Sequence, residues 1–311
     1  MEKRKIGGDK GLDITIVGIG CNAFGRRLDE DKTRPVIHAA LDAGINFFDT
    51  AEGYGDGRSE EFIGRTIQGK RDQVVLATKF GLRASHVPGK NPGSRENAVA
   101  AIDMSLKRLR TDYVDLYQLH MPDAATPIAE TLSVMNDLVR AGKVRLIGCS
   151  NFSGAELCEA IDTANQMGLE SFVTAQNPWS VLDRDVEADL VPSCAENGVG
   201  VLPYYPLAKG LLTGKYRRGE TGPVGSRLEG ASEVANADFD TLEALERFAT
   251  NRGFDILTLA VSWLTSQPTT VSVISGATRA DQLAENVAAA GWNMSTDDFA
   301  IIDQILGGHT S

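Results

Sequence analysis

Short apolar runs alternate with amphipathic segments along almost the whole chain of 311 residues. Eight runs are strand candidates: 14–20, 46–49, 74–79, 114–120, 144–150, 172–177, 200–204 and 271–274. Helices are expected near 34–43, 59–66, 95–109, 128–141, 154–167, 186–197, 239–252, 256–266, 280–289 and 296–306. Strands that alternate with helices predict a parallel sheet with right-handed crossovers. Eight such units fit a closed (β/α)8 barrel.

The alternative to a barrel is an open, doubly wound sheet, which normally carries a glycine-rich fingerprint after its first strand. The run Gly18-Ile19-Gly20-Cys21-Asn22 lacks the third glycine of that fingerprint, and the next helix starts too late. Lys5–Leu12, with paired glycines between short runs, is expected to be a hairpin that closes the barrel floor. We therefore predict an α/β fold with a single (β/α)8 TIM barrel domain over residues 1–311, an N-terminal hairpin and extra C-terminal helices.

Turn-forming residues mark several boundaries. Ser94 is expected to cap the helix at 95–109, and Ser153, with Glu156 three residues later, the helix at 154–167. Glycines follow the ends of four predicted helices, where a left-handed residue is favoured: Gly44, Gly142, Gly168 and Gly198. Long loops are expected at 83–94 and 216–236, and long loops often serve in binding.

Four side chains capable of proton transfer lie at or just past the ends of three successive strand candidates: Asp49, Tyr54, Lys79 and His120. In a parallel barrel the carboxyl ends of the strands open on one face, where catalytic groups gather. A buried ammonium beside a phenol should stabilise the phenolate and lower the pKa of the phenol, and a carboxylate should balance the ammonium. We therefore expect Tyr54 to act as an acid, tuned by Lys79, anchored by Asp49 and assisted by His120.

These residues lie within motifs that resemble those of the aldo-keto reductases. The first is GINFFDTAEGYG at 44–55, followed by SEEFIG at 59–64. The others are ATKFG at 77–81, DLYQLH at 115–120, IGCSNF at 147–152, AQNPW at 175–179, YYPLAKGLLTGK at 204–215 and ISGAT at 274–278. They occur in family-like order and spacing over nearly the whole chain, which makes their joint occurrence specific.

The resemblance implies a barrel that binds a nicotinamide cofactor, usually NADPH, and reduces a carbonyl compound to an alcohol. Ser150, Asn151 and Gln176 match positions that orient the nicotinamide, and Tyr204 matches the aromatic residue stacked on its ring. The positions for the pyrophosphate are matched by Tyr205, Pro206, Leu207 and Lys215. Those for the adenosine 2′-phosphate and adenine are matched by Gly276, Thr278, Arg279, Gln282, Glu285 and Asn286.

Some positions depart from the commoner family pattern. Ser275 stands where proline is frequent, Tyr205 where serine is frequent, and Trp179 where tyrosine is often found. The first two would affect cofactor affinity. Trp179 corresponds to the substrate side, and with Phe24 it is our candidate for the substrate pocket, although core packing is the usual role of such aromatic residues.

The net charge and the cysteine content argue against several classes of binding partner. A net charge of −11 argues against a nucleic-acid or anionic membrane surface. The four cysteines form no CxxC pair and have no metal-like spacing with histidine, so no metal site is expected. No signal peptide and no membrane-spanning run are evident, which favours a cytoplasmic protein with a small-molecule substrate.

Two other functions stay open. A Schiff-base aldolase that uses Lys79 suits the barrel, but leaves the cofactor positions unexplained. A regulatory subunit that binds the cofactor, senses redox state and turns over slowly is also compatible with the motifs. The sequence does not identify the substrate, the preferred direction of the reaction or the oligomeric state.

Overall fold

The computed structural model describes residues 1–8, 11–82 and 85–307. Its centre is a parallel sheet whose strands are β3 (Val17–Gly20), β4 (Phe47–Asp49), β5 (Val75–Phe80), β6 (Val114–Leu119), β7 (Val144–Ser150), β8 (Thr174–Gln176), β9 (Gly200–Val201) and β10 (Val273–Gly276). The strands lie in the order β10-β3-β4-β5-β6-β7-β8-β9. Parallel bridges between Val201 and Thr270, and between Tyr204 and Ile274, join the two ends of the sheet. The predicted (β/α)8 barrel is confirmed.

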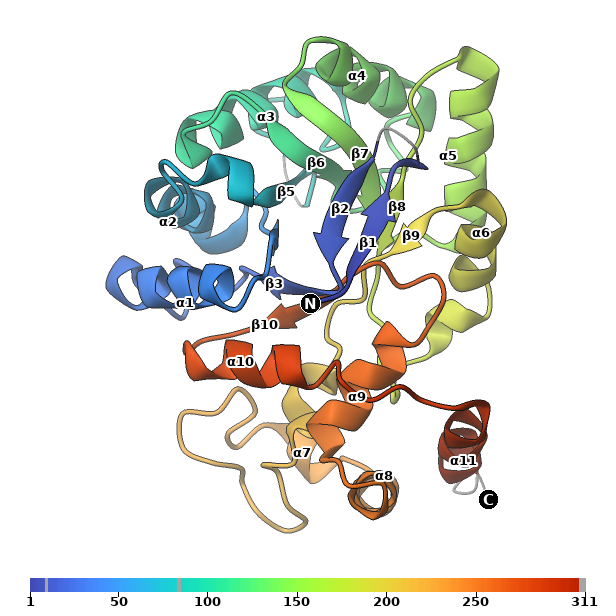
Figure 1. Cartoon of the computed structure of the whole chain (residues 1–311). Helices are drawn as coiled ribbons and strands as arrows, with labels where there is room; N and C mark the ends of the chain where they lie inside the picture. Colours follow the sequence, from blue (N-terminus) through green and yellow to red (C-terminus); the bar gives the residue numbers. More distant parts are fainter. Residues whose placement is uncertain (9–10, 83–84, 308–311) are drawn as a thin grey trace.

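Helices surround the barrel (Figure 1). The connections between the earlier strands contain α1 (Glu30–Asp42), α2 (Arg58–Thr66), α3 (Arg95–Leu109), α4 (Ile128–Arg140), α5 (Gly154–Met167) and α6 (Leu190–Asn197). The remaining helices are α7 (Ser232–Ala235), α8 (Phe239–Asn251) and α9 (Ile256–Thr265) before β10, and α10 (Asp281–Ala288) and α11 (Thr296–Gly307) after it. The expected extra helices near the C-terminus are therefore present.

An N-terminal hairpin closes one end of the barrel, as predicted. Its strands β1 (Lys3–Ile6) and β2 (Leu12–Thr15) pair antiparallel. Hairpin side chains form a buried cluster with residues of the barrel strands: Ile6, Leu12 and Ile14 with Phe47, Ala77, Leu116 and Ile274. The apolar side chains of the hairpin therefore fill the floor of the barrel. Figure 1 shows the β1–β2 hairpin lying across this end of the barrel.

The guanidinium of Arg4 fixes the hairpin to the C-terminal part of the chain. It donates to the backbone carbonyls of Thr265 (2.6 Å), Gln267 (3.2 Å) and Thr270. Thr265 ends α9, where backbone carbonyls have no partner within the helix. Arg4 thus satisfies carbonyls near the end of α9 and in the connection to β10.

The strand expected at 14–20 is two strands, β2 and β3, with a break at Ile16. The amide of Ile16 donates to the Glu2 carbonyl, and the Thr15 amide donates to the side chain of Asn46. These distant partners take the place of continuous pairing, so β2 belongs to the hairpin and β3 to the barrel.

The helix expected at 34–43 begins earlier, at Glu30. The side chain of Asp29 accepts from the Lys32 amide, and acidic residues in the first turn suit the positive end of the helix dipole. These contributions outweigh the cost of Pro35 inside the helix.

Two other segments differ in part from expectation. The predicted helix at 186–197 is a 3-10 turn, Asp185–Glu187, followed by the separate helix α6. Asp189 caps α6, and its side chain accepts a hydrogen bond from the Leu190 amide. The predicted loop at 216–236 contains the short helix α7. Residues 83–84 of the other predicted loop lie outside the described residues, as do 9–10 of the hairpin and 308–311.

Candidate active site

Asp49, Tyr54, Lys79 and His120 come together at the carboxyl ends of the barrel strands. Asp49 ends β4, Lys79 lies near the end of β5, and His120 follows β6. Lys79 and Asp49 are 0% and 2% exposed, and Nζ of Lys79 lies 2.7 Å from Oδ2 of Asp49. The rings of Tyr54 and His120 meet edge to face, with centroids 5.9 Å apart. The structure therefore brings the four predicted side chains into one site.

The ammonium of Lys79 has three N–H groups and three acceptors. It donates to Oδ2 of Asp49, to the carbonyl of Thr50 at 2.9 Å and to the hydroxyl of Tyr54 at 3.5 Å. Burial alone would lower the pKa of Lys79, but Asp49 and Tyr54 outweigh burial and raise it. Lys79 is therefore a cation at neutral pH, beside the phenol.

The pKa of Tyr54 departs from expectation. Burial raises the pKa of the phenol, the Asp49 charge adds to this, and the Lys79 ammonium offsets only part of it. The expected net lowering is therefore wrong for this structure, because burial favours the uncharged phenol. At neutral pH Tyr54 carries its proton, as a proton donor must.

His120 is neutral at neutral pH. Burial and the nearby Lys79 charge lower the pKa of its imidazole to about 3, and the side chain is 7% exposed. Among the residues that the structure describes, Nδ1 of His120 has no hydrogen-bond partner. A neutral ring can give or accept a hydrogen bond near Tyr54, but it is not a source of protons above about pH 4.

Replacing His120 with glutamine should make the free energy of unfolding depend less on pH below pH 6.5. The ordinary pKa of histidine, 6.5, falls to about 3 in the folded protein, so only the unfolded chain gains this proton below pH 6.5. Wild-type stability should therefore lose about 1.4 kcal/mol per pH unit from this group as the pH falls from 6.5 toward 3. Urea unfolding of both proteins across this range measures the difference, and parallel curves would contradict the lowered pKa.

Two glutamine amides hold the other oxygen of Asp49. Nε2 of Gln176 donates to Oδ1 of Asp49 at 2.9 Å, and Nε2 of Gln118 donates to the same oxygen at 3.2 Å. Gln176 was expected among the cofactor residues, and its contact with Asp49 was not foreseen. Gln118 was not predicted as a site residue, since a single polar residue in an apolar strand gives no signal in the sequence.

The polar residues expected around the nicotinamide form a connected group. Ser150 ends β7, and its hydroxyl donates to the Gln176 carbonyl at 2.8 Å. Nδ2 of Asn151 donates to the carbonyl of His120 at 2.9 Å, and Oδ1 of Asn151 accepts from the hydroxyl of Tyr204 at 2.7 Å. Asn151 has φ +61°, a left-handed conformation that asparagine tolerates better than most residues. Ser150, Asn151 and Tyr204 thus lie beside His120.

The segment after Tyr204 has a strained backbone. Tyr205, Ala208 and Lys209 all have positive φ, an uncommon conformation that is concentrated at functional sites. Pro206 is buried and Leu207 is partly buried, while Lys215 is exposed. The guanidinium carbon of Arg227 lies 4.8 Å from the Tyr205 ring, which places this one side chain of the 216–236 segment over Tyr205. The sequence alone gave no reason to favour Arg227 over other surface charges.

The third group of predicted cofactor residues lies around the start of α10. Oε1 of Gln282 accepts from the backbone amides of Thr278 and Arg279. Gly276, Arg279 and Glu285 are exposed. The other residue of the group, Asn286, is buried.

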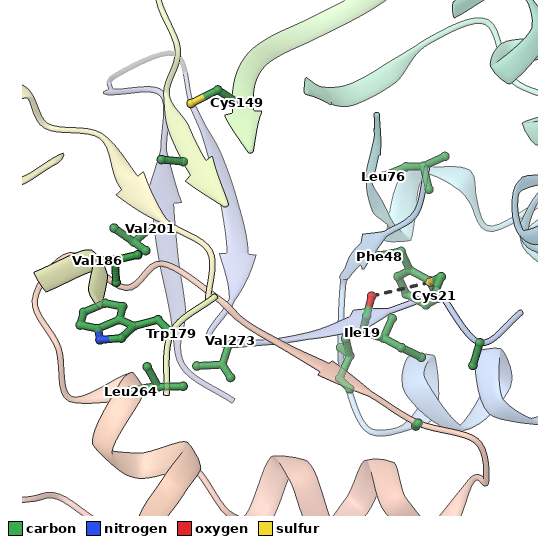
Figure 2. Packing of buried hydrophobic residues seen from close by; sticks show 14 of the residues in the cluster. Ile19, Cys21, Phe48, Leu76, Cys149, Trp179, Val186, Val201, Leu264 and Val273 are labelled. Atoms are coloured by element: carbon green, nitrogen blue, oxygen red, sulfur yellow. Dashed lines mark hydrogen bonds between the residues drawn. The ribbon is translucent and has the colours of Figure 1, made fainter. Parts of the chain in front are cut away.

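The Phe24 and Trp179 side chains are buried in the core, at 0% and 1% exposure. Trp179 lies beside Val186 and Leu264 in Figure 2, and its indole N–H donates to Glu187. Neither ring offers a surface to a substrate in this arrangement, so a place in the substrate pocket is not supported for either.

Within residues 1–8, 11–82 and 85–307, no group of three or more His, Cys, Asp or Glu side chains is arranged to hold a metal ion. No helix there is long and apolar enough to cross a membrane.

Comparisons with known proteins agree with this geometry. A model of the Aldo/keto reductase family matches residues 16–307. The chain is 36% identical to the aldo-keto reductase YhdN of Bacillus subtilis, over 96% of this chain and 92% of that protein. It is 35% identical to the NADH-specific methylglyoxal reductase of Escherichia coli, over 95% and 93%.

Among solved structures, a glycerol dehydrogenase from Gluconobacter oxydans has a TM-score of 0.85 and 30% sequence identity. The match covers 99% of this chain and 96% of that chain. The protein therefore belongs to the aldo/keto reductase family, whose members are oxidoreductases that use nicotinamide cofactors.

Proposed function

We propose that the protein reduces the carbonyl group of a small aldehyde or ketone to an alcohol, or runs the reverse reaction on a sugar or a pyridoxal-like alcohol. NADPH is the proposed cofactor and Tyr54 the proton donor. The observation that carries the proposal is the placement of Lys79 between Tyr54 and Asp49. We also propose that residues 1–311 form a single functional domain and that the protein is cytoplasmic.

The side chains of the site suit proton delivery to a carbonyl oxygen. The nicotinamide, when bound, would supply the hydride. Tyr54 would give its proton to the oxygen, and the Lys79 ammonium would stabilise the phenolate that remains. The neutral His120 would share a hydrogen bond with the same oxygen. Asp49 would keep the positive charge of Lys79 in place during the transfer.

The residues present fit the cofactor. Ser150, Asn151 and Gln176 would hold the carboxamide, which would compete with the Tyr204 hydroxyl for Oδ1 of Asn151. Tyr204 would stack on the nicotinamide. Among the described residues, the buried Oγ of Ser275 in β10 and Nδ2 of Asn286 in the second half of α10 lack hydrogen-bond partners. Both belong to the two elements between which the adenosine would bind.

The pyrophosphate would lie along the strained segment. Its contacts would be the backbone and side chains of Tyr205, Pro206 and Leu207, together with Lys215. We add Arg227 to this set, because its position over Tyr205 brings a cation to the same stretch. The remaining adenosine contacts would come from Gly276, Thr278, Arg279, Gln282 and Glu285.

The structure disfavours the aldolase alternative. A Schiff-base lysine must be deprotonated to attack a carbonyl carbon. The pKa of Lys79 is raised by Asp49 and Tyr54, and all three of its N–H groups have acceptors. This amine is held in the form that cannot attack.

A carbonyl-reduction assay tests the proposed function. The purified protein is mixed with NADPH or NADH and a panel of small aldehydes and ketones, and the absorbance of the reduced cofactor is followed. Consumption of cofactor that depends on the carbonyl supports the proposal. One rapid turnover followed by a very slow steady state would favour the redox-sensing subunit, and no consumption with any carbonyl would refute the reductase.

Replacing Arg279 with alanine should weaken NADPH binding and leave NADH binding unchanged. Only NADPH carries the 2′-phosphate, and Arg279 is an exposed cation beside the first turn of α10. A loss of about five- to tenfold is expected, because the contact is exposed to solvent and shared with Asp281. Quenching of tryptophan fluorescence measures both affinities. Equal losses for both cofactors would contradict a role at the 2′-phosphate.

A further inference from the structure

Gln118 lies in a polar layer inside the barrel, directly below the site. Lys79 on β5 is in register with Gln118 on β6, Gln118 with Gly148 on β7, and Gly148 with Thr174 on β8. The side chain of Gln118 is fully buried. Its amide reaches Asp49, as the Lys79 ammonium does, so both side chains project to the same side of the sheet.

Gly148 makes room for the Gln118 side chain. A Cβ atom at position 148 would lie 3.3 Å from Cγ of Gln118 and 2.3 Å from Oγ1 of Thr174. The second distance is shorter than real contacts allow, so a larger residue on β7 would displace its neighbours. The absence of a side chain there therefore lets a long polar side chain occupy the barrel interior.

The hydrogen bonds of Asp49 divide between its two oxygens. Oδ2 faces the Lys79 ammonium, while Oδ1 accepts from the amides of Gln118 and Gln176. With donors on both oxygens, the carboxylate has little freedom to rotate. The ammonium, bound to Asp49 and to the Thr50 carbonyl, is thereby left with its third N–H directed at Tyr54.

The fold alone gives no reason for glutamine at this position. Among the described residues, Oε1 of Gln118 has no hydrogen-bond partner. A buried acceptor without a partner destabilises a protein, and an apolar side chain of similar shape would avoid this cost. What glutamine provides, and methionine or leucine could not, is the donor to Asp49.

We infer that Gln118 is a positioning residue, which holds the Asp49 carboxylate so that Lys79 is directed at Tyr54 during proton transfer. The inference rests on the proposed function for its catalytic consequence. Among the described residues no hydrogen bond joins the Gln118 side chain to Tyr54 or His120; Gln118 acts through Asp49 and Lys79. Gln176 is the second donor, but it is also a proposed cofactor residue, which makes Gln118 the cleaner position to test.

The test compares Gln118→Met with Thr174→Val as a matched control. Both changes remove a polar group from the same layer at similar shape, but only the first removes a donor to Asp49. For Gln118→Met we expect kcat to fall about tenfold, with KM and the dissociation constant of the cofactor unchanged and no loss of thermal stability. Thr174→Val should keep the wild-type kcat.

A second readout needs no turnover. The wild-type and Gln118→Met proteins are each titrated to alkaline pH, with and without the further change Tyr54→Phe. Within each pair, the difference between the two absorbance curves is the phenolate absorbance of Tyr54. The groups that face this phenol are Lys79, Asp49, the Cys21 thiol and the His120 ring. With one donor lost, Asp49 carries more uncompensated charge and Lys79 is less well held, so the Tyr54 midpoint should move to higher pH in Gln118→Met.

The outcomes separate the inference from the proposed function. An unchanged kcat, or a loss of kcat that Thr174→Val shares together with a lower melting temperature, would overturn the positioning role. If the wild-type protein reduced no carbonyl, the proposed function would fail. The titration alone would then decide the inference: an unmoved Tyr54 midpoint overturns it, and a higher midpoint supports it.

Discussion

Replacing Tyr54 with phenylalanine is expected to lower the rate of carbonyl reduction by a factor of about 100 to 10,000, the usual contribution of a positioned acid. The change removes only the hydroxyl group that Lys79 reaches at 3.5 Å. The aromatic ring and its edge-to-face contact with His120 are kept. Cofactor binding should therefore stay within about twofold of wild type, which fluorescence titration measures beside the rate.

Tyr113→Phe is the matched control for this experiment. Tyr113 comes just before β6, away from the site, and is partly buried beside Arg71. The same loss of a hydroxyl there should leave the rate unchanged. Reduction by the Tyr54→Phe protein at near wild-type rate would exclude Tyr54 as the proton donor. The acid would then have to be another group or water.

Replacing Lys79 with methionine should destabilise the fold as well as abolish proton transfer. The change leaves the carboxylate of Asp49, 2% exposed, with one oxygen lacking its cation. Breaking a buried ion pair from one side costs about 3–5 kcal/mol. The free energy of unfolding in urea measures the loss, and activity should vanish even where the variant is fully folded.

Lys143→Met provides the comparison for the Lys79 variant. Lys143 pairs with Asp103, but both side chains are exposed, so its loss should cost less than about 1 kcal/mol. Combining Lys79→Met with Asp49→Asn should recover part of the lost stability, because the uncompensated charge is removed. Equal losses for the two lysine variants would contradict a tightly paired Lys79 and Asp49.

The sequence predicted helix bounds well where the capping residues lie within a few residues of the helix start. The helices at 95–109 and 154–167 have the expected bounds. Ser94 accepts from the Asn97 amide, and Ser153 and Glu156 form the expected capping box. Such contacts span three residues, so a sequence contains all that determines them.

Expectations were wrong where two structural preferences conflict. The break at Ile16 depends on Glu2 and Asn46, which lie far from it in the sequence. The α1 start moved because a cap and a dipole effect competed with Pro35. At Ile16 a local preference conflicts with tertiary contacts, and at the start of α1 two local preferences conflict. Only the folded chain shows which preference is stronger.

The four proposed catalytic side chains could be placed from the sequence because they follow strand ends, which a parallel barrel gathers on one face. Their electrostatics could not, since the raised pKa of Tyr54 depends on how completely the folded chain buries it. Gln118 and Arg227 were missed for a related reason. A polar residue in a strand and a cation in a loop gain meaning only from what they touch, here Asp49 and Tyr205.

The pairing of the first barrel strand with the last has a consequence for how the chain is made. β3, near the N-terminus, pairs with β10, and Arg4 binds carbonyls at 265–270. During synthesis on a ribosome these partners emerge after every other strand of the barrel, although domains tend to fold as they appear. One edge of β3 and the side chain of Arg4 must therefore wait until residues 265–276 have been made. The barrel cannot close before β10 has left the ribosome.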